Sequence, residues 1–540
     1  MSTITPEGLP RAPRPGDTGA RDEGASSVRA LGHWLDWLLI PIFVLFFTTR
    51  LVPQSLWDRS IYQSVAERLI AGGRLYVDVV DNKDPLFYYA IAAQRLIGPF
   101  AEYAFELISV LGSALIAAAF ARKFYPERRA GQRLVLIGVA FMLTGPHYDL
   151  GGSIPPGIFL ALLTIWLATQ RRGIAAGMAL AVLLFTKLIF APIALAFVVV
   201  HEVTRSLTSG GAVRFLARIG AACAGTSAAV LLLLSARGEL SGYLAVQHSN
   251  LFYSANNVFS ATTLGGNVRN HVLTAIYFGK TILLASLAAF LFLMVRFRQR
   301  APGDPLRPYL AACLALYPIT LAVIWLTVIW GPHMAVLHIF LALAAAVAVP
   351  DLLGSGRPLL AWPAILAWGW ALGWSPPDDW FANDPRDFPD RLADLTAPSP
   401  EAVALHQVAG PAPVRYARLG LDNDFHHAGG TRRDRLVCPQ FFQYRFTEAR
   451  LLDSILICSS RADYLIVDFP EDEPLVPGTF VSPVANFDEL NARWRGFTAK
   501  AEAMVQKDFH CVRSRETIRI CRRNGFLPAA VRRPSGRAGA

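Results

Sequence analysis

Long apolar runs recur through the first 374 residues of this 540-residue chain, with short polar stretches between them. A helix needs about 20 apolar residues to cross the hydrocarbon core of a bilayer, and by this criterion the pattern predicts about eleven transmembrane helices. They are expected near residues 37–53, 103–121, 134–146, 154–169, 174–186, 188–201, 216–235, 273–295, 309–330, 333–350 and 358–374. The predicted fold class is therefore a mostly α polytopic membrane protein.

Composition agrees with this pattern and then locates the charge. The chain is 53% hydrophobic and only 17% charged, with a mean hydropathy of +0.37, which excludes a lone soluble enzyme. Up to Trp374 there are 29 basic and 18 acidic residues, and 22 of each follow, so the whole excess of +11 lies in the apolar part. A nucleic-acid partner is disfavoured because the polar tail carries no excess positive charge.

The distribution of basic residues predicts the orientation in the membrane. If the N-terminus is cytoplasmic, the inner loops hold 19 of the 29 basic residues, as the positive-inside rule requires. An odd number of spans then places the C-terminal region outside. We expect a multi-pass cell-membrane protein with a cytoplasmic N-terminus, in contact with membrane lipids.

The same pattern divides the chain into regions. The first residues are rich in Pro, Gly, Arg and Ser and lack the large apolar side chains of a core. The predicted regions are a disordered cytosolic tail (1–32), a transmembrane domain (33–374) with long outer loops at 54–102 and 236–272, an extracytoplasmic α/β domain (375–525) and a second disordered tail (526–540).

In the C-terminal region, Val414–Leu419 and Ala462–Asp468 have the pattern of strands, and residues 487–500 that of a helix. There is no phosphate loop or nucleophile elbow. The domain is expected to bind the acceptor or to cover an active site, and a purely structural role is the alternative.

Four of the six cysteines lie in this region, and an even number in an exported domain favours two disulfides. Cys511 and Cys521 flank a predicted hairpin, which leaves Cys438 to pair with Cys458. A zinc site is the alternative; its candidate histidines are His426, His427 and His510. No Cys-x-x-Cys spacing supports it.

The first outer loop contains the most informative polar residues. Ala66, Leu69 and Ile70, followed by Gly72-Gly73, indicate a helix that lies on the membrane surface and ends at the glycines. Asp58 stands near the start of this helix. A carboxylate at the membrane interface is costly unless it is used or paired, so Asp58 is a candidate catalytic base, and a helix N-cap is the alternative.

Two lysines are predicted at the outer interface. Lys83 precedes Asp84-Pro85-Leu86, and Lys187 lies in a short turn between two apolar helices without an acidic neighbour in sequence. Both are candidates for binding a phosphate group. The alternative for each is a lysine whose stem lies in the membrane and whose ammonium group reaches water.

Other outer turns concentrate polar groups of the kind that bind sugars. His147 and Asp149 lie within residues 145–153, His248 lies within Gln247-His248-Ser249-Asn250, and His333 follows Gly331-Pro332. A structural histidine at the interface is the alternative for His147 and His333.

The order of these elements resembles a known family. Asp58 is followed by Tyr62, then by Gly73-Arg74-Leu75-Tyr76, then by the segment Lys83–Tyr89, and an apolar helix ends in Thr186-Lys187. This order is similar to that of the GT-C superfamily of polytopic glycosyltransferases. The resemblance is greatest to the bacterial branch related to protein mannosyltransferases and to the aminoarabinose transferase of lipid A.

The resemblance implies transfer of a sugar from a polyprenyl-phosphate donor to an extracytoplasmic acceptor, which is a glycan, a lipid or a protein. It implies Asp58 as the general base and Lys83 and Lys187 as ligands of the donor phosphate. The expected substrate-binding residues are Tyr62, Asp81, Asp84, His147, Asp149, His248 and His333.

Two departures from the family pattern limit what is carried over. Arg59 follows Asp58 where many relatives have a second acid, and Asp84 replaces the first proline of the Lys-Pro-Pro-Leu element. No cofactor or metal site is therefore predicted, with a divalent cation as the alternative. A lipid-linked glycan ligase or oligosaccharide transferase is the alternative enzyme, and a lipid or sugar transporter the non-enzymatic one. We find no internal repeat of the kind that transporters have.

Overall fold

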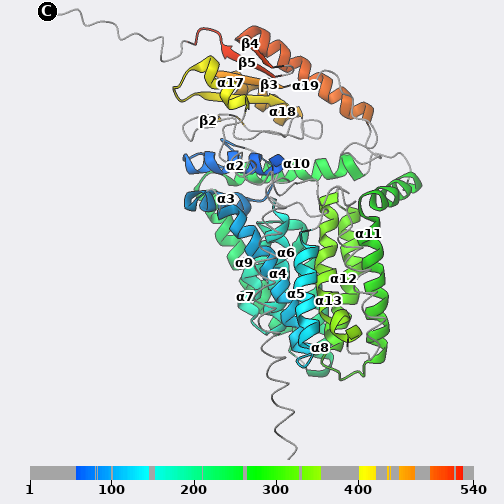
Figure 1. Cartoon of the computed structure of the whole chain (residues 1–540). Helices are drawn as coiled ribbons and strands as arrows, with labels where there is room; N and C mark the ends of the chain where they lie inside the picture. Colours follow the sequence, from blue (N-terminus) through cyan, green and yellow to red (C-terminus); the bar gives the residue numbers. More distant parts are fainter. Residues whose placement is uncertain are drawn as a thin grey trace, which may run out of the picture. The chain divides into compact units, whose positions relative to one another are not determined.

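The computed structural model describes residues 56–79, 81, 83–98, 101–144, 152–209, 211–258, 264–326, 331–353, 400–420, 435–436, 438, 449–468, 487–515 and 518–526. Within these ranges the chain is mostly helical, and a small sheet forms near the C-terminus (Figure 1). The predicted spans 37–53 and 358–374 lie outside the described residues.

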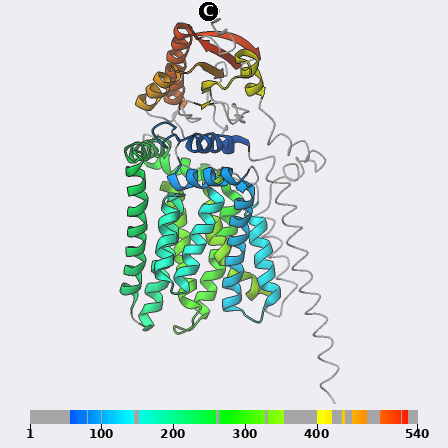
Figure 2. The same ribbon diagram turned by 90° about the vertical axis from the view of Figure 1, so that its left-hand side faces the viewer.

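Long apolar helices packed side by side form the first part of the chain (Figures 1 and 2). Six of the described helices contain a segment long and apolar enough to cross a membrane. They are α4 (Ala101–Phe124), α8 (Ala191–Ser209), α9 (Ala212–Ala236), α11 (Leu264–Gln299), α12 (Arg307–Leu326) and α13 (Leu337–Leu353). Nearly every side chain of α13 is buried, so this helix lies at the centre of the bundle.

Three shorter helices complete the bundle: α5 (Arg129–Met142), α6 (Ile154–Thr169) and α7 (Gly173–Leu184). Pro155 and Pro156 stand in the first turn of α6, where a proline removes no intrahelical hydrogen bond. Gly177 lets α7 pack closely on α9, because a Cβ there would lie 2.3 Å from the carbonyl oxygen of Ile219. These helices correspond to the predicted spans at 134–146, 154–169 and 174–186.

The two predicted outer loops are themselves largely helical. The first forms α2 (Leu56–Ile70) and α3 (Pro85–Ile97), and the second forms α10 (Leu240–Val258) and the start of α11. Helix α2 ends where the Gly-Gly pair predicts: Gly72 adopts a positive φ of 84°, and its N–H donates to the Leu69 carbonyl at 3.0 Å. Both segments therefore have a regular backbone.

The C-terminal region contains a five-stranded sheet in the order β2-β1-β3-β5-β4. The strands are β1 (Arg415–Gly420), β2 (Arg435–Leu436), β3 (Tyr464–Asp468), β4 (Phe509–Arg515) and β5 (Ile518–Arg523). Strands β2, β1 and β3 are parallel, whereas β5 is antiparallel to β3 and β4. Residues 464–467 of β3 are all buried, as in a central strand covered on both faces.

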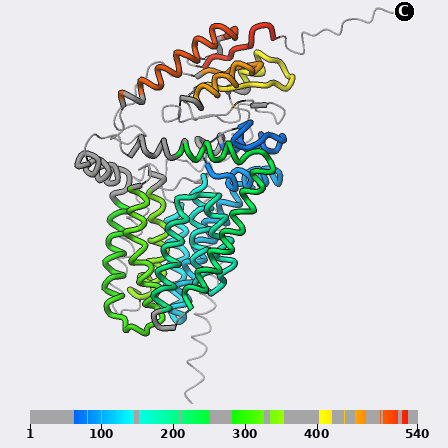
Figure 3. Tube along the Cα trace, turned by 180° about the vertical axis from the view of Figure 1, so that it is seen from behind, coloured from blue at the N-terminus to red at the C-terminus, as the bar shows by residue number. Residues whose placement is uncertain are grey.

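Three helices accompany the strands: α17 (Pro400–Ala409), α18 (Ala449–Ser459) and α19 (Phe487–Asp508) (Figures 1 and 3). Helix α19 extends about two turns beyond the predicted end near residue 500 and leads directly into β4. The predicted strands near 414–419 and 462–468 and the hairpin around 511–521 are present.

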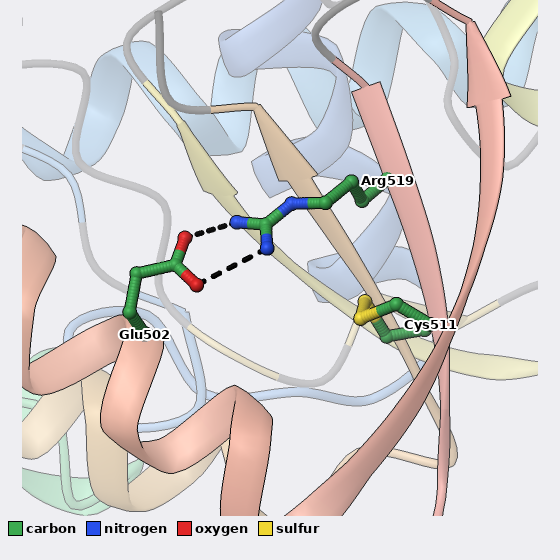
Figure 4. The surroundings of a disulfide bond; sticks show 4 residues. Glu502, Cys511 and Arg519 are labelled. Carbon is green, nitrogen blue, oxygen red and sulfur yellow. Dashed lines mark hydrogen bonds and ion pairs between the residues drawn. A yellow bond between two sulfur atoms is a disulfide. The ribbon is translucent and has the colours of Figure 1, made fainter. Parts of the chain in front are cut away.

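Both disulfides favoured by the cysteine spacing are present. Cys438 pairs with Cys458, and Cys511 pairs with Cys521 across the β4–β5 hairpin. Figure 4 shows the second bridge near a bidentate ion pair, in which Arg519 of β5 donates two hydrogen bonds to the Glu502 carboxylate of α19. The hairpin is thus connected to the helix by charge and closed on itself by a covalent bond.

Candidate functional site

A tight turn at residues 73–79 follows α2 and determines where Lys83 lies. Tyr76 adopts a positive φ of 62°, and its N–H donates to the Val79 carbonyl at 2.7 Å. The buried Tyr76 hydroxyl donates to the carbonyl oxygen of Lys83 at 2.7 Å. The Gly-x-x-Tyr element therefore closes the loop between Tyr76 and Lys83.

The turn packs on α10 at a glycine. A Cβ at Gly242 would lie 2.4 Å from the carbonyl oxygen of Tyr76, so only glycine allows this approach. The Tyr76 and Tyr243 rings also contact each other, with centroids 5.5 Å apart. The first and second outer loops are therefore packed against each other at this point.

Glu239, at the junction of α9 and α10, fixes both ends of the first outer loop. Its side chain is fully buried and accepts hydrogen bonds from the Leu75 N–H at 3.0 Å and from the Tyr89 hydroxyl. Arg237 pairs with it at 2.9 Å and also donates to the Gly73 carbonyl at 3.4 Å. Burial, with the hydrogen bond and negative charge of Glu239, raises the pKa of Tyr89, so its hydroxyl remains a donor.

Asp84 connects three separate segments through one buried carboxylate. The residue is 8% exposed; it accepts a hydrogen bond from the Leu188 N–H at 3.1 Å and one from the Gln247 amide of α10 at 3.3 Å. A second hydrogen bond joins the segments of Asp84 and Leu188, because the Leu86 N–H donates to the Phe185 carbonyl at 2.9 Å. Lys83 and Lys187, which adjoin these bonded positions, are thereby brought to one place.

Burial and the two lysine charges have opposite effects on the pKa of Asp84. Burial is the largest influence and raises the pKa of Asp84, although the Leu188 N–H and the charges of Lys187 and Lys83 oppose it. Both lysines remain partly exposed. The cluster thus combines two partly exposed ammonium groups with a buried acid.

Tyr62 and Asp81 lie beside Lys83. The Lys83 ammonium nitrogen is 5.7 Å from the centroid of the buried Tyr62 ring, within the range of a cation–π interaction. Tyr88 donates its hydroxyl to the buried Asp81 carboxylate. Burial and the charge of Asp81 raise the pKa of Tyr88 well above its ordinary value. Tyr62 and Tyr88 are therefore part of the support around Lys83.

Helix α2 is fixed to the bundle by a chain of charged contacts. Arg95 of α3 pairs with Glu67 of α2 and with Glu102 of α4, the latter at 3.0 Å. Gln63 of α2 donates to Glu102 at 3.0 Å. Asp58 lies in the first turn of this helix, so its backbone belongs to a segment that is attached to α3 and α4.

The other predicted site residues are distributed as follows. His248 follows Gln247 on α10 and is exposed. His333 lies in the 3₁₀ helix η2 (Gly331–Val336). His147 and Asp149 lie outside the described residues. Asp81 and Asp84, both expected to bind substrate, direct their carboxylates into contacts within the protein.

Among the described side chains, no group of three or more His, Cys, Asp or Glu residues could hold a metal ion. The side chains of Asp58, His147, Asp149 and His333 are not part of that set. Lys83 and Lys187 instead offer ammonium groups, which bind phosphate as point charges.

Sequence reasoning missed three residues that organise the site: Glu239, Gln247 as a partner of Asp84, and Glu102. A usable signal existed for two of them. Glu239 and Glu102 are acids at the ends of apolar segments, where an unpaired carboxylate would be costly. That argument was applied only to Asp58.

The raised pKa of Asp84 predicts how stability depends on pH. Between the ordinary and the raised pKa the folded protein binds more protons than the unfolded chain, so the contribution of Asp84 falls as pH rises through this window. Asp84→Asn removes the titration. We expect the melting temperature of the variant, minus that of the wild type, to become more positive as pH rises from about 4.

Asp78→Asn is the matched control, with the opposite sign. Burial would raise the pKa of Asp78, but hydrogen bonds from the Arg74 side chain and N–H and the charge of Arg74 outweigh burial and lower it. Its difference from the wild type should therefore become more positive as pH falls. Parallel pH profiles for the two variants would contradict the assignment of Asp84.

Glu239 is predicted to be a major stabilising residue of the first outer loop. Glu239→Ala leaves the Leu75 N–H, the Tyr89 hydroxyl and Arg237 without their acceptor. We expect the free energy of unfolding to fall by about 3 kcal/mol. This is the lower end of the range for a broken buried ion pair, because Arg237 is partly exposed. Amide hydrogen exchange at residues 73–84 should accelerate. Glu67→Ala, which removes a more exposed ion pair, should cost no more than about 1 kcal/mol, and equal losses would refute the prediction.

Comparison with known proteins gives a distant structural likeness only. No protein-family model matches the chain, and no curated protein matches it. The chain is similar to a crystal structure of the Archaeoglobus fulgidus oligosaccharyltransferase in complex with Zn and sulfate, with 12% identity, a TM-score of 0.43, and coverage of 79% of this chain and 67% of that chain. For the apo form of that protein the values are 11%, 0.42, 79% and 69%. A likeness at this level assigns neither a family nor a reaction to this chain.

Proposed function

We propose that this protein is a membrane glycosyltransferase of the GT-C type that moves a sugar from a polyprenyl-phosphate donor to an extracytoplasmic acceptor. The observation that supports this most directly is that Lys83 and Lys187 both lie within electrostatic range of one buried carboxylate, Asp84. They come from two segments about a hundred residues apart, and both adjoin ends of apolar helices. A lipid phosphate at the membrane interface is a ligand that fits two such ammonium groups.

The proposed reaction needs a base and an anion site. Asp58 takes the proton of an acceptor hydroxyl or amine, and the freed electron pair attacks the anomeric carbon of the sugar. The bond between that carbon and the phosphate oxygen breaks, and its electron pair leaves with the lipid phosphate. Lys83 and Lys187 stabilise the negative charge that develops on the leaving group. Attack opposite the leaving phosphate inverts the anomeric centre.

The remaining residues and regions have the following proposed roles. Tyr62, Asp81 and Asp84 support Lys83 and Lys187 rather than contact the sugar, whereas His147, Asp149, His248 and His333 remain proposed sugar-binding residues. The cluster lies at the outer interface of the cell membrane, with the N-terminus cytoplasmic. The C-terminal domain is extracytoplasmic, in a compartment that allows its two disulfides to persist. It binds the acceptor or covers the active site.

Asp58→Asn tests the base. The amide keeps the size of the side chain but cannot take a proton, so sugar transfer by the purified protein should fall by about 10²- to 10⁴-fold. Binding of the polyprenyl-phosphate sugar should be retained. The control is Asp78→Asn. Asp78 lies in the same loop and pairs with Arg74 on the surface, so its replacement should leave turnover near the wild-type level. Full turnover in Asp58→Asn would remove Asp58 from this role.

Lys187→Met tests the phosphate site. Loss of one positive charge at a developing anion should lower kcat/KM by about 10²-fold, and Lys187→Arg, which keeps the charge, should recover part of it. The measurement is transfer from a panel of polyprenyl-phosphate sugars, together with donor binding. An unchanged dependence on donor concentration in Lys187→Met would contradict the assignment. Transfer only from preassembled lipid-linked glycans would identify the ligase alternative, and movement of lipid without bond cleavage the transporter alternative.

A further inference from the structure

A second charged cluster lies at the far end of the span that begins beside Lys187. This span is Leu188–Ser206, and Glu202 lies near its end, with a side chain that is 1% exposed. Arg171, in the turn between α6 and α7, pairs with one oxygen of Glu202. Arg205 binds the same oxygen at 3.2 Å and the other at 3.3 Å. One buried carboxylate thus holds two guanidinium groups side by side.

Arg171 is held in place from three directions. Its backbone has a positive φ of 63°, a conformation that is unfavourable for a residue other than glycine and persists only where the surroundings impose it. Its guanidinium lies 4.0 Å from the centroid of the Phe215 ring of α9, and Glu202 binds its edge. Little freedom remains for the side chain to lose when a ligand binds.

Both guanidinium groups remain accessible. The side chains of Arg171 and Arg205 are 42% and 35% exposed, although the carboxylate between them is buried. A guanidinium has five N–H donors, and Arg171 uses one of them on Glu202. Because both groups bind one carboxylate oxygen, their accessible edges are close enough for a single phosphate to contact both.

Lys123 adds a third cation. It lies at the end of α4, is exposed, and donates to the Thr169 carbonyl at 3.3 Å. It also lies within electrostatic range of Arg205. Lys123, Arg171 and Arg205 are three cations, and Glu202 is the one carboxylate that pairs with two of them, which leaves an excess of two positive charges. An ion-pair network built only for stability would be closer to balance, so the cluster is suited to an anion.

The surface of α8 beside the cluster favours a lipid over a soluble anion. Leu195, Val199 and Val203 follow one another at intervals of four residues and are 44%, 36% and 46% exposed. This spacing places them along one helix face, one turn before Ser206, whose hydroxyl donates to Glu202 at 3.4 Å. An apolar stripe for an acyl chain therefore leads to a cationic cluster for a headgroup.

We propose that Arg171, Arg205 and Lys123 bind the phosphate headgroup of an anionic membrane lipid, whose acyl chain lies along Leu195, Val199 and Val203 of α8. The site is separate from the cluster of Lys83, Asp84 and Lys187, and it does not depend on the proposed glycosyl transfer. Basic pockets between transmembrane helices are a recurrent means of binding such headgroups.

The test uses the full-length protein in nanodiscs of phosphatidylcholine, with or without phosphatidylglycerol. The anionic lipid should raise the melting temperature and remain bound in native mass spectrometry. Each charge removed should weaken retention about fivefold, so the Arg171→Gln/Arg205→Gln pair should lose most of it. Arg298→Gln removes the same charge from an exposed position at the end of α11 and should have no effect.

Two further arms keep the outcome decisive. If the double variant does not fold, Lys123→Gln carries the test, because Lys123 contacts only a backbone carbonyl among the hydrogen bonds described for it. Unchanged lipid retention in the folded variants would overturn the proposal. Equal stabilisation of the wild type by inorganic phosphate in phosphatidylcholine alone would also overturn it, since the site would then bind a soluble anion.

Discussion

The arrangement of the candidate site depends on the buried carboxylate of Asp84. Its two oxygens bind the backbone after Lys187 and the amide of Gln247, so three segments that are distant in sequence meet at one side chain. A charged group is costly to bury unless hydrogen bonds and opposite charges compensate it. Here the compensation comes from the N–H of Leu188 and from the two lysines, and the raised pKa of Asp84 shows that it is incomplete. A single carboxylate thus lies within electrostatic range of two lysines.

The loop that carries Lys83 and Asp84 is supported at both ends by other segments. Glu239 binds the first end through Leu75 and the second through Tyr89, while Tyr76 closes the middle by donating to Lys83. Tyr76 has a positive φ, and Gly242 leaves room for its carbonyl oxygen. Local strain is thus compensated by contacts from α9 and α10. This explains why a Gly-x-x-Tyr element and a lysine seven residues later belong together.

Sequence periodicity predicted the apolar helices at 103–121, 188–201 and 216–235, because burial in lipid leaves a strong local signal. The cysteine spacing predicted both disulfides for a similar reason: a hairpin defines one pair and leaves the other. Two lysines at the same interface could also be expected to approach each other. What could not be predicted is the contact that joins them. The bonds from Leu188 to Asp84 and from Leu75 to Glu239 span 104 and 164 residues, and such contacts depend on how helices pack rather than on local pattern.

The cations at the two ends of α8 differ in part: two lysines lie near Asp84, whereas the second cluster consists of two arginines and one lysine. Near Lys187 the acid is buried and its pKa is raised. The lysines there carry compact ammonium groups on flexible stems, which suits the proposed binding of a phosphate whose charge changes during a reaction. Near Glu202 two guanidinium groups share one carboxylate, and one of them stacks on Phe215, which suits a ligand that binds without reacting. A single span can thus serve a reactive phosphate at one end and a lipid headgroup at the other.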